Sequence, residues 1–421
     1  MARPRHHHGR RHLRGFGYFK RLGPGLVTGA SDDDPSGIGT YSQVGAGFGF
    51  GLLWTALVSL PMAAAVQETA GRLGLVTGKG LAALIKERFP RWVLFGCVGL
   101  VCVANTFNVG ADLGSMAAAT RLVVPIPQTV LVVTLAAGTL ALEVLLPYSK
   151  YSKVLRWLAL SLGAYVAVLF AVKVDWAQVA RHTFIPTLRR DRAALAALIA
   201  IFGTTISPYL FFWQASEEVE EGGEHGEAGP LGDAHIRAMR GDCVAGMVSA
   251  VAIMFAIMVA SAATLGAHGV TTVQTADQAA RALQPIAGRV AGLLFALGIV
   301  GTGALAVPIL AGSTAYALAE TFGWREGLSR TLREARGFYG AIALSMLVGL
   351  ALGFAGIDPI RALYFAAILN GLAAPPLILV MLVLSNSPGV VGSRTGGPLS
   401  NVLMAIALTV MAGLPIAYLL R

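Results

Sequence analysis

The sequence predicts an all-α polytopic membrane protein in which two groups of five helices repeat in opposite orientation and an eleventh helix follows. Three observations lead to this fold class. The 421 residues are 55% hydrophobic and only 13% charged, whereas soluble proteins carry about 25% charged residues. Eleven apolar runs approach the roughly 20 residues that a helix needs to cross a bilayer. Two of these runs, five apart in order, are interrupted by polar residues and proline.

The apolar runs define the predicted spans in chain order. Their approximate bounds are 24–47, 50–73, 93–120, 124–146, 154–172, 193–215, 241–265, 288–319, 338–355, 360–384 and 399–420. The first repeat is expected over residues 22–172, the inverted second repeat over 193–384 and the extra span over 399–421. Residues 1–21 are basic and lack an apolar core of their own, so they are predicted to form a cytoplasmic tail rather than a signal peptide.

The basic residues predict the orientation. With the N-terminus in the cytoplasm, most of the 32 Lys and Arg residues fall in cytoplasmic segments and the C-terminus lies outside. The loop that holds Lys173, Arg181, Arg189, Arg190 and Arg192 is an exception. The expected location is a bacterial inner membrane. The net charge of +10 does not indicate nucleic-acid binding, because the basic residues are distributed between apolar segments. No obligatory protein partner is expected.

Three acidic residues and a proline interrupt the first span. The span reads GPGLVTGASDDDPSGIGTYSQVGAG and places Asp32, Asp33 and Asp34 directly before Pro35. One acid at the centre of a lipid-facing helix costs about 2.5–3.5 kcal/mol, and proline removes a backbone donor. The helix is therefore predicted to unwind at about residues 32–36, inside the protein or facing water.

Span 6 is interrupted at the corresponding place. It reads LAALIAIFGTTISPYLFFWQASEEVEE, with Thr204, Thr205, Ser207 and Pro208 inside an apolar helix. Paired interruptions in two halves of a chain point to a transport site at the membrane midplane. Freed carbonyl oxygens and Asp34 predict an oxygen-lined cation site there. Because neither break contains sulfur or imidazole, the site should suit magnesium, calcium or manganese more than copper or zinc.

The two breaks resemble those of the Nramp family of divalent metal transporters, which have a LeuT-type fold. The family's Asp-Pro-Gly-Asn corresponds to DPSG at 34–37, its Gly-Ala-x-Ile-Met-Pro-His to GTTISPY at 203–209, and its Asp-Leu-x-Glu to DLGS at 112–115. The resemblance implies that Asp34 and the Thr204 carbonyl bind the metal. It also places Gly37 and Ser207 where the family has an asparagine and a methionine ligand.

The departures from the family pattern predict the ion. Without the soft methionine sulfur, Ser207 should weaken the preference for soft transition metals. Small residues at 37 and 207 should widen the site for a partly hydrated magnesium ion, which loses its water reluctantly. The pattern resembles the magnesium-transporting branch of the family. Mg²⁺ is therefore the expected substrate, with Mn²⁺ as a second one, and no cofactor is expected.

Two further departures predict weak or absent proton coupling. The family's histidine after the span 6 proline is Tyr209 here, and its span 3 glutamate is Ser115, so that Asp112 remains alone. Three alternatives stay open. They are a proton-coupled manganese or iron importer of the ordinary Nramp kind, a sodium-coupled solute symporter on the same fold, and an intramembrane enzyme, for which the sequence offers no catalytic motif.

Other polar residues are candidates for the surroundings of the site or the path to it: Asp32, Asp33, Thr205, Tyr209, Asn370, Asp112, Glu217 and Glu218. Glu68 and Glu320, near helix ends, are expected to be structural hydrogen-bond or ion-pair partners.

Overall fold

The computed structural model describes residues 24–145, 162–187, 191–224, 233–354 and 356–421, and these residues form helices and no strand. The helices that correspond to the predicted spans are α1 (Pro24–Asp32) with α2 (Pro35–Phe48), α3 (Trp54–Thr77), α5 (Arg91–Thr120), α6 (Gln128–Leu145), α8 (Gly163–Ala171), α10 (Arg192–Thr205) with α11 (Pro208–Glu224), α12 (Asp233–Thr264), α15 (Ala291–Phe322), α16 (Arg336–Gly353), α17 (Pro359–Ser385) and α19 (Pro398–Leu419). The predicted tail, residues 1–21, and the first part of span 5 lie outside the described residues.

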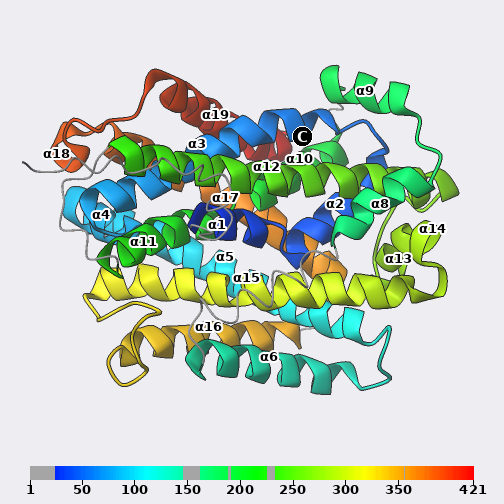
Figure 1. The fold of residues 1–421 in the computed structure, drawn as a ribbon, viewed down its shortest axis with the longest axis horizontal. Coiled ribbons are helices and arrows are strands. Elements are labelled where there is room, and N and C mark those ends of the chain that lie inside the picture. The colour runs from blue at the N-terminus through cyan, green and yellow to red at the C-terminus, as the bar shows by residue number, and fades with distance from the viewer. Residues whose placement is uncertain (1–23, 146–161, 188–190, 225–232, 355) are drawn as a thin grey trace, which may run out of the picture.

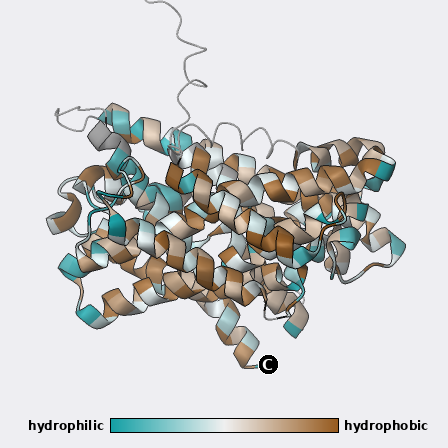
Figure 2. Cartoon of the chain, turned by 90° about the horizontal axis from the view of Figure 1, so that it is seen from below, coloured by the Kyte–Doolittle hydropathy of each residue, from teal (hydrophilic) through white to brown (hydrophobic). Residues whose placement is uncertain are grey.

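Eight segments of the described chain are long and apolar enough to cross a membrane. Three of the eleven predicted spans, the first, second and fifth, are not among these segments, and each absence has a simple cause. Span 1 is split into two short helices, α3 is less apolar and carries Glu68 and Arg72, and α8 is described over only nine residues. Hydrophilic residues gather at the two ends of the bundle and hydrophobic residues lie between them (Figure 2). This distribution is that of an integral membrane protein.

Short helices occupy the connections, where the sequence analysis expected loops. The helices α4 (Leu81–Arg88) and α18 (Pro388–Val391) lie at one end of the bundle. At the opposite end lie α9 (Trp176–Phe184), α13 (Ala276–Ala280) and α14 (Gln284–Ala287) (Figure 1). A chain that crosses the membrane at every span puts these connections on alternate sides in this way.

Each broken span packs through glycine on a helix of the other half of the chain. The helix α1 packs on α12, where a Cβ added to Gly29 would lie 2.4 Å from the Cα of Gly246. The helix α3 packs on α11, where a Cβ at Gly74 would lie 2.1 Å from the carbonyl oxygen of Ala215. Exchanging span 1 with span 6 and span 2 with span 7 relates the packing of α2 on α12 to that of α11 on α3, because α2 and α11 are the second halves of the two broken spans. This correspondence agrees with the predicted arrangement of five plus five helices.

The other halves of the broken spans also pack through glycine. The helix α10 lies against α17, where a Cβ at Gly203 would lie 2.1 Å from the carbonyl oxygen of Ala367. The helix α2 lies against α12, where a Cβ at Gly45 would lie 2.4 Å from the carbonyl oxygen of Met258. Glycine is required at these positions because the neighbouring atoms belong to the backbone and cannot rotate away.

The helix of span 7 is longer than the apolar run at 241–265 that predicted it. The helix α12 begins at Asp233, about two turns earlier, so residues predicted as loop are helical. This extension is held by ion pairs. Asp233 pairs with Arg394, and Arg240 Nε donates to Glu68 Oε1 at 2.8 Å. Polar pairing therefore extends a helix that the apolar pattern alone would end.

Both glutamates predicted to be structural are confirmed as such. Glu68 also accepts a hydrogen bond from Arg72 Nε at 3.1 Å. Glu320 accepts from the backbone N of Ala83 at 2.8 Å and from Ser216 Oγ at 3.0 Å. Its carboxylate therefore caps the N-terminus of α4 from a neighbouring helix.

Candidate functional site

Asp34 organises the break between α1 and α2. Its backbone is extended, with φ −65° and ψ 170°, and Pro35 takes the first helical position of α2. The Oδ1 atom of Asp34 accepts hydrogen bonds from the backbone N of Gly37 (2.8 Å) and from Ser36 Oγ (2.6 Å). One oxygen thus caps α2. The other, Oδ2, is buried and has no hydrogen-bond partner among the described residues.

The break between α10 and α11 frees a carbonyl oxygen. Because Pro208 has no N–H, the Thr204 carbonyl lacks the donor that a continuous helix would supply. The hydroxyl of Ser207 is shared between the carbonyl oxygens of Thr204 (2.8 Å) and Gly203 (3.0 Å). A carbonyl oxygen has two lone pairs. The Thr204 oxygen therefore keeps acceptor capacity at the negative end of α10.

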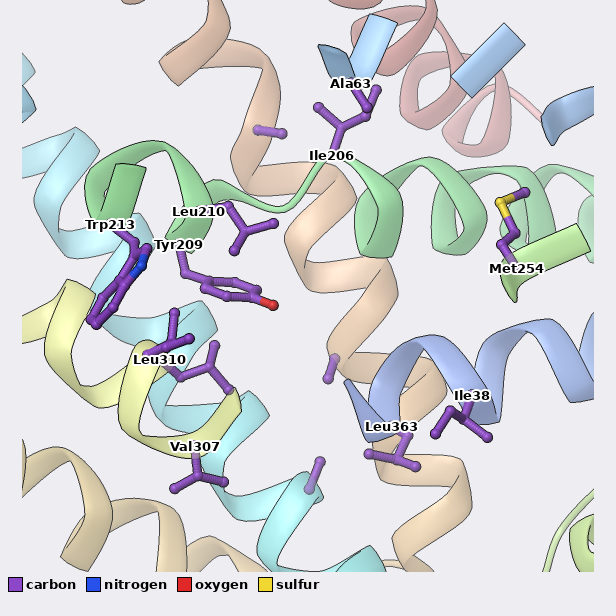
Figure 3. Close-up of a cluster of buried hydrophobic side chains, with 14 of the residues drawn as sticks. Ile38, Ala63, Ile206, Tyr209, Leu210, Trp213, Met254, Val307, Leu310 and Leu363 are labelled. Carbon is purple, nitrogen blue, oxygen red and sulfur yellow. The ribbon is translucent and has the colours of Figure 1, made fainter. Parts of the chain in front are cut away.

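Hydroxyl groups join the two breaks. Ser36 Oγ lies 3.1 Å from Thr204 Oγ1, and Tyr41 Oη lies 3.1 Å from Thr205 Oγ1. Tyr209 Oη donates to the carbonyl of Ser31 at 3.0 Å. The structure therefore brings together the four residues that the resemblance names as the metal site: Asp34, Gly37, Thr204 and Ser207. Hydrophobic side chains such as Ile206 and Leu210 surround the second break (Figure 3).

Gly37 has close neighbours, while the widening of the site expected from the small residues at 37 and 207 stays a prediction. A Cβ at Gly37 would lie 3.2 Å from the Tyr41 ring, 3.3 Å from the Asp32 carbonyl oxygen and 3.5 Å from Thr204 Oγ1. The space that an asparagine side chain would use is therefore bordered closely by Tyr41. The donor atoms at the breaks, and not the space at Gly37, therefore bear on which ion the site suits.

The three consecutive acids are buried, but they do not form one ligand cluster. Asp32, Asp33 and Asp34 are each at most 6% exposed. Within the described residues, no group of three or more His, Cys, Asp or Glu side chains could hold a metal ion together. An ion at the breaks would thus be bound by the Asp34 carboxylate with neutral oxygens and water, which is donor chemistry that hard divalent cations accept.

Two of the predicted neighbours come from other helices. Asp112 on α5 is fully buried, interacts electrostatically with Asp34, and has no hydrogen-bond partner for either carboxylate oxygen among the described residues. Asn370 on α17 accepts from Asn108 Nδ2 at 2.9 Å, and its own amide nitrogen has no partner within the described chain. Asp112 and Asn370 thus extend the polar region beyond the breaks.

Glu217 and Glu218, the acidic candidates for the path to the site, do not line the cavity at their end of the bundle. A cavity of about 430 Å³ there is lined by Glu220, Glu320 and Glu326. Glu218 instead accepts from Gln214 Nε2 at 2.9 Å, and Gln214 accepts from Thr28 on α1 at 2.6 Å. Glu217 is half-buried on the same helix and does not line this cavity.

Comparison with known proteins identifies the family. The profile of the family described as "Natural resistance-associated macrophage protein-like", Nramp, matches residues 25–421. The chain belongs to the Nramp family. It is therefore a membrane transporter and not an enzyme.

Relatives and solved structures cover nearly the whole chain. Two proteins named "Divalent metal cation transporter MntH" are similar to it. The one from Acidiphilium cryptum is 27% identical and covers 95% of this chain and 90% of its own, and the one from Caldanaerobacter subterraneus is 25% identical and covers 92% and 89%. A manganese transporter from Eremococcus coleocola superposes with a TM-score of 0.73 at 19% identity, covering 96% of this chain and 87% of its own. The nucleobase-cation-symport-1 transporter Mhp1 superposes with a TM-score of 0.61 at 15% identity, covering 95% and 91%. This Nramp chain thus has the LeuT-type fold that the sequence predicted.

Two sulfur atoms near the breaks escaped the sequence analysis. Met254 Sδ on α12 lies 3.7 Å from Thr205 Oγ1. A Cβ at Gly303 on α15 would lie 2.6 Å from Met116 Sδ and 3.2 Å from Pro35. The breaks themselves contain no sulfur, as predicted, but thioethers from two other helices lie beside them. Because Met254 and Met116 are far from the breaks along the chain, the sequences of the breaks do not indicate them. The Ser36 hydroxyl was also missed, although its place in DPSG could have indicated it.

Proposed function

We propose that this Nramp chain carries a hard divalent cation, Mg²⁺ first and Mn²⁺ as a second substrate, by alternating access in a bacterial inner membrane, with the N-terminus in the cytoplasm. The metal is the substrate and not a resident cofactor. The observation that carries the proposal is the donor set at the breaks. The unpartnered Oδ2 of Asp34 lies beside a region whose other polar atoms are the hydroxyl and carbonyl oxygens of Ser36, Thr204 and Ser207.

The geometry of Ser207 supports a hard ion. This position corresponds to the family's methionine ligand, and its hydroxyl here contacts the carbonyl oxygens at the end of α10. It supplies oxygen in place of sulfur. Oxygen ligands favour magnesium, calcium and manganese, whereas sulfur favours softer metals.

The geometry of the coupling positions supports weak or absent proton coupling. Tyr209 donates its hydroxyl to the Ser31 carbonyl, and Ser115 Oγ donates to the Asp112 carbonyl at 2.8 Å. Neither side chain titrates near neutral pH. Uptake would then follow the membrane potential, which contributes about 4.6 kcal/mol per 100 mV for a divalent ion, twice the value for one charge.

Uptake by proteoliposomes tests this proposal. Magnesium and manganese influx would be measured at a set membrane potential with a pH dye inside. We expect Mg²⁺ influx without acidification, lost in Asp34→Ala. The matched control is Asp175→Ala, because Asp175 also caps a helix, α9, but is exposed and far from the breaks in sequence.

One specific set of observations favours a second candidate, the proton-coupled manganese or iron importer. Its support is the MntH relatives, the sulfur atoms of Met254 and Met116 beside the breaks, and the unpartnered carboxylate of Asp112. Manganese influx with acidification and without magnesium flux would establish this candidate and overturn the first. Met254→Leu separates the two as well, since it should lower manganese affinity only where the sulfur takes part in binding.

A further inference from the structure

A second buried carboxyl group lies outside the metal site. Glu143, on α6, is 4% exposed, and neither of its oxygens has a hydrogen-bond partner in the described part of the chain. An ionisable side chain inside a membrane span is costly and is commonly functional. The proposed transport mechanism does not use Glu143.

The surroundings of Glu143 connect it to a broken span. A Cβ at Gly312 on α15 would lie 3.9 Å from Glu143 Oε1 and 2.9 Å from the ring of Trp213. The missing side chain at Gly312 therefore gives room to a carboxyl from α6 and to an indole from α11. Trp213 lies one turn beyond Tyr209 on α11, beside Leu310 of α15 (Figure 3). A shift of α11 would change what covers Glu143.

Within the part of the chain that the structure describes, no charged group balances this carboxyl. The helices packed on α6 are α5, α15 and α16. Among the described residues of these helices, the titratable group that interacts electrostatically with Glu143 is Tyr339 on α16, and no basic side chain acts on it. An unpaired carboxylate in an apolar environment is far less favourable than the neutral acid. The packing seen here is therefore compatible with a protonated Glu143.

The contacts of Glu143 indicate the side of the membrane toward which it lies. Glu143 is in the last described turn of α6, and Tyr339, with which it interacts, lies in the first turn of α16. The hydroxyl of Tyr339 donates to the carbonyl of Arg330, in the connection between α15 and α16, at 2.8 Å. Water reaching Glu143 would thus come from the end of the bundle that carries this connection.

We propose that Glu143 is a proton-binding residue that exchanges its proton with one side of the membrane only, so that the transport rate depends on the pH of that side without net proton transport. Closing the bundle around Glu143 takes up one proton, and solvating the carboxyl releases it to the same side. Raising the pH on that side disfavours the closed packing and slows transport. The proposal rests on the proposed alternating access, but not on the identity of the ion.

The experiment compares the pH dependence of metal uptake in wild type and Glu143→Gln, with the pH varied on one face of the proteoliposome at a time. In wild type the rate should fall with rising pH on the face bearing the α15–α16 connection, by up to about tenfold per pH unit, the limit for one titrating group. Glu143→Gln, which imitates the neutral acid, should transport metal at a rate independent of this pH. Glu87→Gln, a change at an exposed glutamate paired with Lys79, should retain the wild-type profile.

Several results would overturn the proposal. They are an unchanged pH dependence in Glu143→Gln, a dependence on the pH of the other face, or a wild-type proton influx that the variant abolishes. Glu143→Leu provides a second neutral side chain, and loss of uptake in both neutral variants would also contradict the proposal. Infrared difference spectra should show a carboxylic-acid band in wild type that Glu143→Gln lacks. Failure of the proposed function can be distinguished from failure of this proposal. The first would appear as absent Mg²⁺ uptake or as no effect of Asp34→Ala. The pH profile that tests Glu143 can be measured with Mn²⁺ as well.

Discussion

The ion pairs of Glu68 allow a prediction with a built-in comparison. The same carboxylate oxygen accepts from two arginines, Arg72 at 3.1 Å and Arg240 at 2.8 Å. The Arg72 side chain is 1% exposed and that of Arg240 is 47% exposed. Removing the charge in Glu68→Gln leaves the buried guanidinium of Arg72 uncompensated, which should lower the free energy of unfolding by about 3–5 kcal/mol. Arg240→Gln leaves the buried pair intact and should cost at most about 1 kcal/mol.

Denaturant unfolding of the purified protein in mixed micelles, followed by tryptophan fluorescence, measures both variants and their combination. The double variant should resemble Glu68→Gln, because the effect of Arg240 requires the carboxylate. Equal destabilisation by the two single variants would refute the reasoning from burial. A free energy of unfolding for Glu68→Gln within about 1 kcal/mol of the wild-type value would also refute it. This threshold is the contribution of a typical exposed ion pair, about 0–1 kcal/mol.

Three further predictions follow from other parts of the structure. Ser207→Met should raise cadmium and manganese affinity by restoring a sulfur ligand, and titration calorimetry showing unchanged affinity would contradict the ligand role of this position. Gly203→Ala should abolish folded expression, since its Cβ would lie 2.1 Å from the Ala367 carbonyl oxygen, whereas alanine at the exposed Gly340, where a Cβ meets no atom within 4 Å, should be tolerated. Burial, and after it the carboxylates of Glu320 and Glu220, raise the pKa of Glu326 from its ordinary 4.5 to about 8. The folded state therefore holds a proton that the unfolded state releases, so thermal stability should fall as the pH rises between these values and fall less in Glu326→Gln; equal slopes would contradict this.

The sequence predicted the features that depend on local composition. The interruptions at Asp34 and Pro208 are visible because charge and proline cannot continue an apolar helix. Their separation by five spans predicted the inverted repeat, and the packing of α2 on α12 and of α11 on α3 agrees with it. The structure also brings the four predicted ligand positions together, while their role in binding metal stays a prediction.

The features that the sequence did not predict depend on distant contacts. The Tyr41–Thr205 and Ser36–Thr204 hydrogen bonds join residues 164 and 168 positions apart. Met254 reaches the second break from another helix, and no periodicity within a single span places its sulfur there.

The capping role of Asp34 has a consequence for turnover. The oxygen that accepts from Gly37 and Ser36 is committed to the start of α2, so an ion can take the carboxylate in monodentate fashion without unwinding the helix. Bidentate binding would first have to replace hydrogen bonds to a charged group, which contribute about 1.5–3 kcal/mol each. Each hydrogen bond lost in this way corresponds to an affinity for the bidentate ion lower by about one to two orders of magnitude. A carrier gains from this limit, because an ion held by one carboxylate oxygen dissociates sooner and leaves the protein ready for its next cycle.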